Sequence, residues 1–219
     1  KNELRRMANM AQENLDHAIH GFLNQSNEFV DKVYHREEDI NNVSHAITDY
    51  LVKSNQLSLP LADQKILGSM FYVVNDIERI GDHAENFADY TKTEIKHNTG
   101  LTGDAKEEIK KMYTAVSKLL KLSLECFMEQ DGVNKPEDKL AEIAILEASI
   151  DKMERRYQKH HIKRLAKGEC EPRAGLLFSD MLSELERIAD HSVNIAYSMS
   201  DEDEDEILAA ENEDLTAKN

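Results

Sequence analysis

Two short segments of this chain carry the same charged residues at the same spacing. Residues 75–88 read NDIERIGDHAENFA and residues 183–196 read SELERIADHSVNIA, with seven of the fourteen positions identical. In a helix, residues four apart share one face, and two carboxylates at that spacing repel each other mildly when both are ionised. Each segment therefore presents an acidic stripe that needs a compensating positive charge. The stripes consist of Glu78, Asp82 and Asn86 in the first copy and Glu186, Asp190 and Asn194 in the second.

A metal ion is one source of that charge, because a second acidic pair precedes each segment. Glu37 and Asn41 in the first copy align with Glu147 and Asp151 in the second. The helices concerned are joined by a short loop and should be antiparallel neighbours, so their acidic faces can meet. Side-chain oxygens suit hard cations such as Mg²⁺, Mn²⁺ or iron, and the sequence does not separate these ions from Zn²⁺. The sequence predicts a metal site at Glu147, Asp151, Glu186 and Asp190. It predicts a weaker one at Glu37, Glu78 and Asp82, because Asn41 replaces a carboxylate.

An ordinary salt-bridged helix face is the competing interpretation. Arg79 and Arg187 follow the Glu in each copy, and we expect them to tie this helix to an acidic side chain in either case. His83 and His191 follow the Asp and lie about 100° further round the helix. A hydrogen bond from each His to a neighbouring acid is favoured over ligation of a metal. We regard these four residues, with the two Asn residues of the stripes, as supporting residues.

Six helices are predicted to carry these residues. Apolar residues recur at helical spacing over residues 3–24, 28–53, 61–97, 104–129, 137–167 and 173–200. Pro60 suits the start of the third helix, and Asp104 with Glu107 suits a capping box at the start of the fourth. The third helix should turn one apolar side toward the core, namely Val73, Ile77, Ile80, Ala84 and Phe87.

The order of helices repeats together with the residues. This repetition predicts an all-α fold of two tandem three-helix bundles related by an internal repeat, residues 1–98 and 104–200, joined by a linker at 99–103. Residues 201–219 hold nine acids and one Lys. A segment so strongly charged does not pack into a core, so we expect this tail to be disordered.

Composition excludes several classes of protein. The formal net charge of -16 argues against binding to nucleic acid, whose phosphates need Lys and Arg. A mean hydropathy of -0.62 and a longest apolar run of five residues, 70–74, exclude a membrane span within this chain. Two cysteines are too few for a disulfide framework, and Cys126 lies on an apolar helical stripe typical of a core thiol.

The two repeated segments, together with the Glu147-x-x-Ile-Asp151 element, resemble the phosphate uptake regulator family, PhoU. The resemblance covers about residues 3–200. Members of that family look like two tandem three-helix bundles, and some carry metal clusters on paired Glu/Asp-x-x-x-Asp motifs. The resemblance therefore implies a metal role for the seven acidic residues named above, and Asn41 departs from the motif.

Finer features look like one branch of that family. Three features look like the cytosolic C-terminal domain of sodium-dependent phosphate symporters: Glu169-Cys170, residues 174–182 running into 185–191, and the opening Arg6-Met7-Ala8. That resemblance implies a transmembrane phosphate-transport domain as partner, in the same polypeptide, and a location at the cytoplasmic face of the membrane. A start at Lys1 without Met, with Arg5 close by, agrees with a chain that begins just after a membrane segment.

The leading functional expectation is thus a non-enzymatic regulatory domain in phosphate uptake. The alternative is a free-standing PhoU-type regulator that contacts a phosphate ABC transporter and a sensor kinase. An enzyme of the di-metal carboxylate class needs Glu-x-x-His on two helices, and this chain has one such pair, Glu94 with His97. We therefore predict no enzymatic activity. The sequence leaves open whether the chain forms a homodimer.

Overall fold

The computed structural model describes residues 1–97, 100–130 and 136–199, and within these ranges every secondary-structure element is a helix. The predicted all-α fold is confirmed, because no strand occurs in the described residues. The helices are α1 (Asn2–Asn24), α2 (Asn27–Asn55), α3 (Leu61–His97), α4 (Gly103–Glu129), α5 (Glu137–Ala166) and α6 (Pro172–Tyr197).

The turns between helices follow local chemistry. Gln25 adopts the left-handed conformation (φ 52°) and ends α1, and the Gln64 N–H donates to the Pro60 carbonyl at 3.0 Å where α3 begins. The predicted capping box at Asp104 is wrong. Thr102 caps α4 instead, because its hydroxyl accepts the Ala105 N–H at 3.3 Å.

The last helix is also shorter than the predicted 173–200, since α6 ends at Tyr197 and a turn follows. Two of the expectations fall at least partly outside the described residues. These are the linker, of which residue 99 is not described, and the acidic tail at 201–219.

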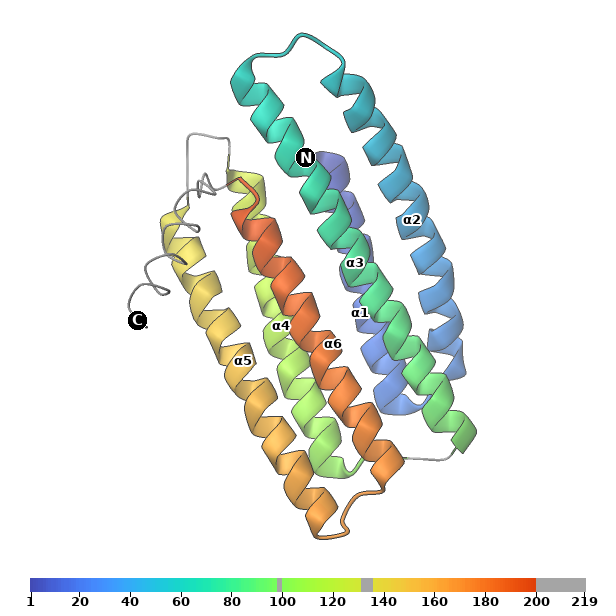
Figure 1. Ribbon diagram of the computed structural model, residues 1–219. Coiled ribbons are helices and arrows are strands. Elements are labelled where there is room, and N and C mark those ends of the chain that lie inside the picture. Colours follow the sequence, from blue (N-terminus) through green and yellow to red (C-terminus); the bar gives the residue numbers. More distant parts are fainter. Residues whose placement is uncertain (98–99, 131–135, 200–219) are drawn as a thin grey trace, which may run out of the picture.

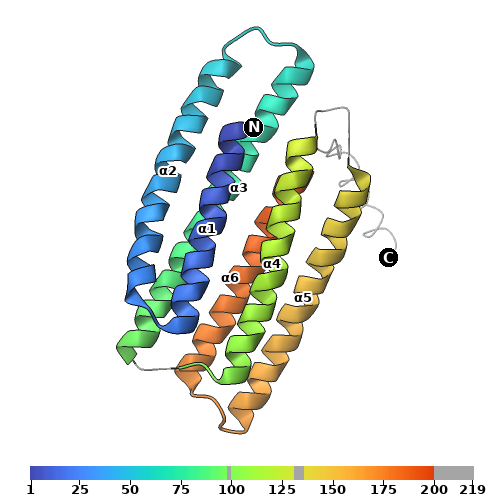
Figure 2. The same ribbon diagram turned by 180° about the vertical axis from the view of Figure 1, so that it is seen from behind.

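Each repeat is a bundle of three long helices, α1 with α2 and α3, and α4 with α5 and α6 (Figure 1). The bundles join through α3 against α6, with a smaller contact of α1 against α4. Figure 2 shows α1 and α4 side by side from behind, while α2 and α5 form the two outer edges. The two copies of the repeated segment therefore lie on the two helices that meet in the middle of the molecule.

The core occupies the interior of both bundles. Val73, Ile77, Ile80, Ala84 and Phe87 are all fully buried, as the sequence predicted. Cys126 is buried as expected and accepts a hydrogen bond from the Gln130 amide at 3.2 Å. Burial of an aliphatic or aromatic side chain of this size contributes about 1.5–3 kcal/mol, so this row holds α3 firmly in one rotation about its axis. That rotation decides where the charged residues of α3 point.

Candidate functional site: acidic stripes and an inter-repeat clasp

In the first repeat, one member of the acidic stripes is buried. Glu37 on α2 is 4% exposed, and neither of its carboxylate oxygens has a hydrogen-bond partner among the described residues. It lies against the backbone of Gly81 on α3, where a Cβ would stand 2.5 Å from Glu37 Oε2. Only glycine leaves room for this approach. The sequence placed Glu37 on the stripe but gave no sign of its burial.

Burial changes the acidity of Glu37. Its pKa rises to about 8, chiefly because burial removes water from the carboxylate, and then because the charges of Asp82, Glu85 and Glu78 lie nearby. The amide of Asn14 is near enough to lower that pKa somewhat, although neither amide atom forms a hydrogen bond. The acidic residues of α2 and α3 therefore face each other as the sequence predicted, and Glu85 joins them.

The acidic residues of the second repeat have the same arrangement, but their first carboxylate is more exposed to solvent. The pKa of Glu147 is raised by burial and by the charges of Asp151 and Asp190. The pKa of Asp190 is raised by burial and by Asp151. The pKa of Glu186 is raised by burial, then by Asp190, Glu154 and Asp151. The acids of α5 and α6 are thus close enough to oppose one another's ionisation. Glu154 belongs to this group, although the sequence reasoning passed over it.

The two repeats differ in the residue that faces the first carboxylate of the stripe. The position of Gly81 is taken in the second repeat by Ala189. In the first repeat a methyl group at this position would stand 2.5 Å from Glu37 Oε2, and in the second repeat, where alanine is present, Glu147 is only half-buried. The two stripes are therefore related in sequence but differ in how deeply their first carboxylate is buried.

These residues fit a hard cation in their chemistry, since all donors are oxygens and Glu37 offers two buried oxygens without partners. They are not gathered as a formed site. In the part of the chain that the structure describes, no three His, Cys, Asp or Glu side chains come together closely enough to hold a metal ion. A bound ion would have to draw the carboxylates of the two helices toward each other. Metal binding by the seven acidic residues stays a prediction.

The arginines of the repeated segment behave differently from each other. Arg79 pairs with Asp82 on its own helix at 3.0 Å, as expected for a salt-bridged face. Arg187 makes no ion pair within the described residues, although its charge lowers the pKa of Glu186. Asp151 pairs with Arg155 at 3.3 Å. Each of these pairs is partly exposed and contributes little to the free energy of unfolding.

The histidines and asparagines of the repeated segment join the two repeats. His83 Nδ1 lies 2.5 Å from Glu184 Oε2, and the Asn86 amide donates to the same oxygen at 3.1 Å. The Tyr90 hydroxyl donates to Glu184 Oε1 at 3.2 Å. The expected hydrogen bond of His83 to an acid is confirmed, but the acid belongs to the other repeat.

The second repeat makes the equivalent contact with the first. His191 Nδ1 lies 2.8 Å from Asp76 Oδ1, and the Asn194 amide donates to that oxygen at 3.4 Å. Asp76 and Glu184 occupy equivalent positions in the two copies. We call this pair of contacts the inter-repeat clasp. Asn86 and Asn194 therefore belong to the clasp and not to the acidic stripes, which corrects the sequence interpretation.

The sequence carried a partial signal for the clasp. The spacing placed both histidines about 100° away from the acidic stripe, toward a different neighbour, but it did not say which helix that neighbour was. Within the clasp, the pKa of Glu184 is held below its usual range. Burial opposes that shift, and the hydrogen bonds from His83, Asn86 and Tyr90 outweigh it.

The remaining candidate ligand pair has another role. Glu94 is fully buried, and its carboxylate accepts the Leu101 backbone N–H at 3.4 Å. It therefore ties the end of α3 to the segment that leads into α4. This contact gives Glu94 a structural function that needs neither His97 nor a metal.

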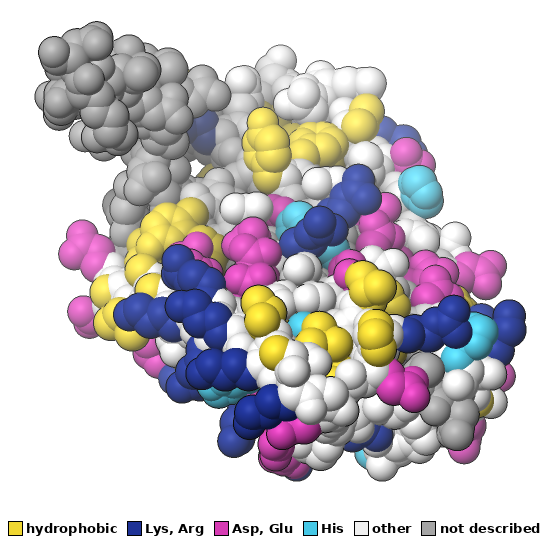
Figure 3. Space-filling view, turned by 60° about the horizontal axis from the view of Figure 1, so that its bottom comes forward, with side chains coloured by type: hydrophobic (Ala, Val, Ile, Leu, Met, Phe, Trp, Pro, Cys, Tyr) yellow, Lys and Arg dark blue, Asp and Glu magenta, His cyan; other side chains and the backbone are white. Residues whose placement is uncertain are grey.

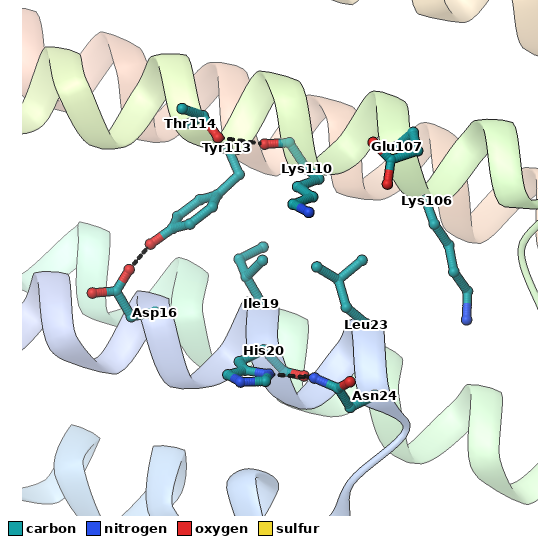
Figure 4. Close-up of a pocket in the computed structure, with 10 residues that line it drawn as sticks. All are labelled: Asp16, Ile19, His20, Leu23, Asn24, Lys106, Glu107, Lys110, Tyr113 and Thr114. Carbon is teal, nitrogen blue, oxygen red and sulfur yellow. Dashed lines mark hydrogen bonds between the residues drawn. The ribbon is translucent and has the colours of Figure 1, made fainter.

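A groove between the repeats was not foreseen from the sequence. It has a volume of about 710 Å³ and lies between α1 and α4 (Figure 4). Ile19 and Leu23 point from α1 toward Lys110 of α4, and the Tyr113 hydroxyl donates to Asp16 across the groove. Lysines and acids both line the rim, so the groove selects no ligand by charge.

Comparison with known proteins identifies the repeat. The family model described as PhoU domain matches residues 4–91 and 109–199. A phosphate-specific transport system accessory protein PhoU homolog 1 from Thermotoga maritima is 22% identical over 196 residues, which are 89% of this chain and 82% of that protein. A PhoU homolog from Synechocystis with the same description is 27% identical over 175 residues, 77% of this chain and 72% of that protein.

A solved structure has the same fold. The crystal structure of PhoU from Pseudomonas aeruginosa superimposes with a TM-score of 0.79 at 21% identity, and the match covers 90% of this chain and 92% of that chain. None of the helices in the described ranges is both long and apolar enough to span a membrane.

Proposed function

The chain belongs to the PhoU domain family, and from this premise we propose that it is a non-enzymatic accessory regulator of phosphate transport. The observation that carries the proposal is the family match to both repeats. The two curated relatives bear the description of accessory proteins of a phosphate-specific transport system. This part of the proposal concerns regulation, and it includes no catalytic step.

The relatives favour a separate accessory protein over a domain fused to a symporter. The match takes in 82% of the Thermotoga protein, which leaves too few residues in that relative for a membrane transporter domain. None of the relatives and structures named above is a symporter. The partner we propose is therefore a phosphate transporter on another chain, met at the cytoplasmic face of the membrane.

Metal binding at the acidic stripes is part of the proposal. Glu147, Asp151, Glu186 and Asp190 would hold one hard cation, and Glu37, Glu78 and Asp82 another. The mutual repulsion of the α5 and α6 carboxylates supports this assignment, because a cation would relieve it. When bound, the ion supplies positive charge that can bridge phosphate or an acidic group of a partner. The net charge of -16 argues against direct capture of phosphate by the protein surface alone.

Deletion of this chain in its own organism tests the regulatory proposal. We expect altered phosphate uptake, or an altered response of uptake to external phosphate, and restoration by the intact chain. Unchanged uptake and response, with the transporter present at normal levels, would contradict the proposal.

The metal assignment has a separate test that needs no transporter. Protein purified without chelator or tag-derived metal is assayed for bound ions and melted with and without chelator. A bound ion stabilises the fold by mass action, so chelation should lower the melting temperature. Glu147→Gln with Asp190→Asn should remove most of that sensitivity, because the site of the first repeat is expected to bind more weakly. Glu38→Gln with Asp39→Asn, the same charge change on exposed acids of α2, should keep it. Identical melting with and without chelator, and no copurified metal, would refute the assignment.

A further inference from the structure

One face of α5 is strongly basic in a chain that is otherwise acidic. Residues 151–167 contain seven Lys or Arg residues and two acids, in a protein with a net charge of -16. Helical spacing places six of these cations on a single face. We call it the α5 basic face, and all six side chains are exposed: Lys152, Arg155, Arg156, Lys159, Lys163 and Lys167.

Most of these charges are not neutralised by the protein itself. Arg155 pairs with Asp151 at 3.3 Å and Lys167 with Glu169 at 3.6 Å. Among the described residues, the other four have no acidic partner, and Arg156 lies over the ring of Tyr157. Exposed cations without partners at this density attract an anionic surface.

The fold does not require the α5 basic face. The equivalent stretch of the first repeat, residues 41–57, contains one Lys and one Asp. The residues at the six equivalent positions are mostly uncharged: Asn42, His45, Ala46, Asp49, Lys53 and Leu57. Helix α2 forms the equivalent helix of the first bundle without these cations, so folding does not account for the basic face of α5.

The α5 basic face is open to a large partner. Among the described helices, α5 packs against α4 and α6 only, at one edge of the molecule. Figure 3 views the molecule from the end where α5 finishes and α6 begins. Lys and Arg side chains gather on the left of this view, the side on which α5 lies in Figure 1. Two large aliphatic side chains are exposed at the same end, Ile162 (63%) near the end of α5 and Leu176 (67%) near the start of α6. Gly175 lies against His161, which places these two segments beside each other.

We propose that the α5 basic face binds the surface of a membrane that contains anionic lipids. Each Lys or Arg near such a surface is attracted to lipid phosphates, and exposed aliphatic side chains partition into the boundary between headgroups and acyl chains. The acids elsewhere on the molecule do not prevent this, because charges further than about 8 Å apart are screened at physiological salt. A cationic row alone would also attract an acidic protein segment. The exposed aliphatic side chains of Ile162 and Leu176 favour a lipid surface over an acidic protein segment.

Vesicle sedimentation tests the proposal on the full chain. Vesicles of phosphatidylcholine alone are compared with vesicles in which roughly one third of the lipid is phosphatidylglycerol, a composition that creates a negative surface potential. We expect binding only to the anionic vesicles, with loss of binding at high salt. Lys152→Gln, Arg156→Gln, Lys159→Gln and Lys163→Gln together should weaken it about tenfold or more. Gln has a helix propensity close to that of Lys and Arg, so the fold should survive.

A matched control removes four exposed cations elsewhere, with Arg5→Gln, Lys53→Gln, Lys96→Gln and Lys121→Gln. The control should retain most of the binding, because those residues lie off the α5 basic face. Equal weakening in both variants would show a general charge effect and would overturn the proposal. Circular dichroism and melting temperature establish that both variants are folded.

Insertion of the aliphatic residues has its own measurement. The chain contains no Trp, so a single introduced Trp reports only its own surroundings. The fluorescence emission of the Ile162→Trp variant should shift to shorter wavelength when anionic vesicles are added. The emission of a Tyr72→Trp variant, which places Trp at an exposed position of α3, should not shift. If the protein binds a peptide of residues 201–219 through the α5 basic face and not the vesicles, the partner is an acidic segment and the lipid proposal is wrong. Vesicle binding measures this face alone, so its failure leaves the regulatory proposal untouched.

Discussion

At the scale of single residues, Glu37 and Gly81 distinguish the first repeat from the second. Both repeats have an acid at the position of Glu37, but only the first has a glycine opposite it. The glycine allows the carboxylate to become buried without a hydrogen-bond partner, and its pKa rises to about 8. A carboxyl group in this state either carries a proton or requires a cation. The acidic stripe of the first repeat is therefore sensitive to both.

The first prediction concerns the stability of the protein against pH. The pKa of Glu37 is raised in the folded state, so folding binds a proton between about pH 4.5 and about pH 8. The free energy of unfolding should fall as pH rises through that window, by about 1.4 kcal/mol per pH unit from this group. Glu37→Gln should remove this contribution and stabilise the protein at pH 8. Denaturant unfolding in the presence of chelator at several pH values measures the difference. If the free energy of unfolding varied with pH in the same way for the unsubstituted protein and for Glu37→Gln, the prediction would be wrong.

A second prediction isolates the role of the glycine. Gly81→Ala places a methyl group on the Glu37 carboxylate and should push that side chain toward water. The pKa of Glu37 should then return toward its ordinary value, which a carbon-detected NMR titration of the carboxyl group would follow. The reciprocal change Ala189→Gly in the second repeat should leave the Glu37 titration where it was. No movement of the Glu37 pKa in Gly81→Ala would show that burial has another cause.

At the scale of elements, the repeated segment does two jobs on two sides of one helix. One side of α3 and of α6 carries the acidic stripe, and the side about 100° away carries the clasp. Because His83 reaches Glu184 and His191 reaches Asp76, each helix supplies both a basic and an acidic partner. The same short sequence thus holds the two repeats together and presents acids to the neighbouring helix.

The third prediction tests the coupling across the clasp. His83→Ala and Glu184→Ala should each destabilise the protein, and the double variant should lose less than the sum of the two. We expect a coupling energy of about 1–3 kcal/mol from the double-mutant cycle, as found for buried pairs in contact. The pKa of Glu184 is lowered in the folded state, so the coupling should be present above about pH 4.5 and should vanish as acid protonates Glu184. Additive losses near neutral pH would mean that His83 and Glu184 do not interact.

Periodicity was sufficient to predict the helices but not their partners across the molecule. The apolar row from Val73 to Phe87 fixed the rotation of α3 correctly, because burying it is worth several kcal/mol. The N-terminal cap of α4 was misplaced by two residues, since Thr102 and Asp104 are both good caps and backbone geometry decides between them. The clasp could not be predicted, because helical spacing within one segment says nothing about which distant helix faces it.

At the scale of the whole molecule, charge is distributed unevenly along the sequence. Residues 201–219 contribute nine acids and one Lys, which is half of the net charge of -16. The α5 basic face carries the opposite sign. Self-repulsion among like charges opposes a compact state, whereas an acidic segment that does not pack costs the fold nothing. We therefore expect the tail to leave the folding of the bundles unaffected. We also expect its negative charge to add to the electrostatic potential around the whole molecule.

The fourth prediction separates these two effects by deleting residues 201–219. The net charge then changes from -16 to -8, because nine acids and one Lys are removed. If the tail is disordered, as its composition predicts, the melting temperature at high salt should stay within about 2 °C of that of the full chain. Affinity for anionic vesicles at low salt should increase, because the long-range repulsion of the surface is weaker. A markedly lower melting temperature would instead show that the tail packs on the bundles, and the prediction of disorder would be wrong.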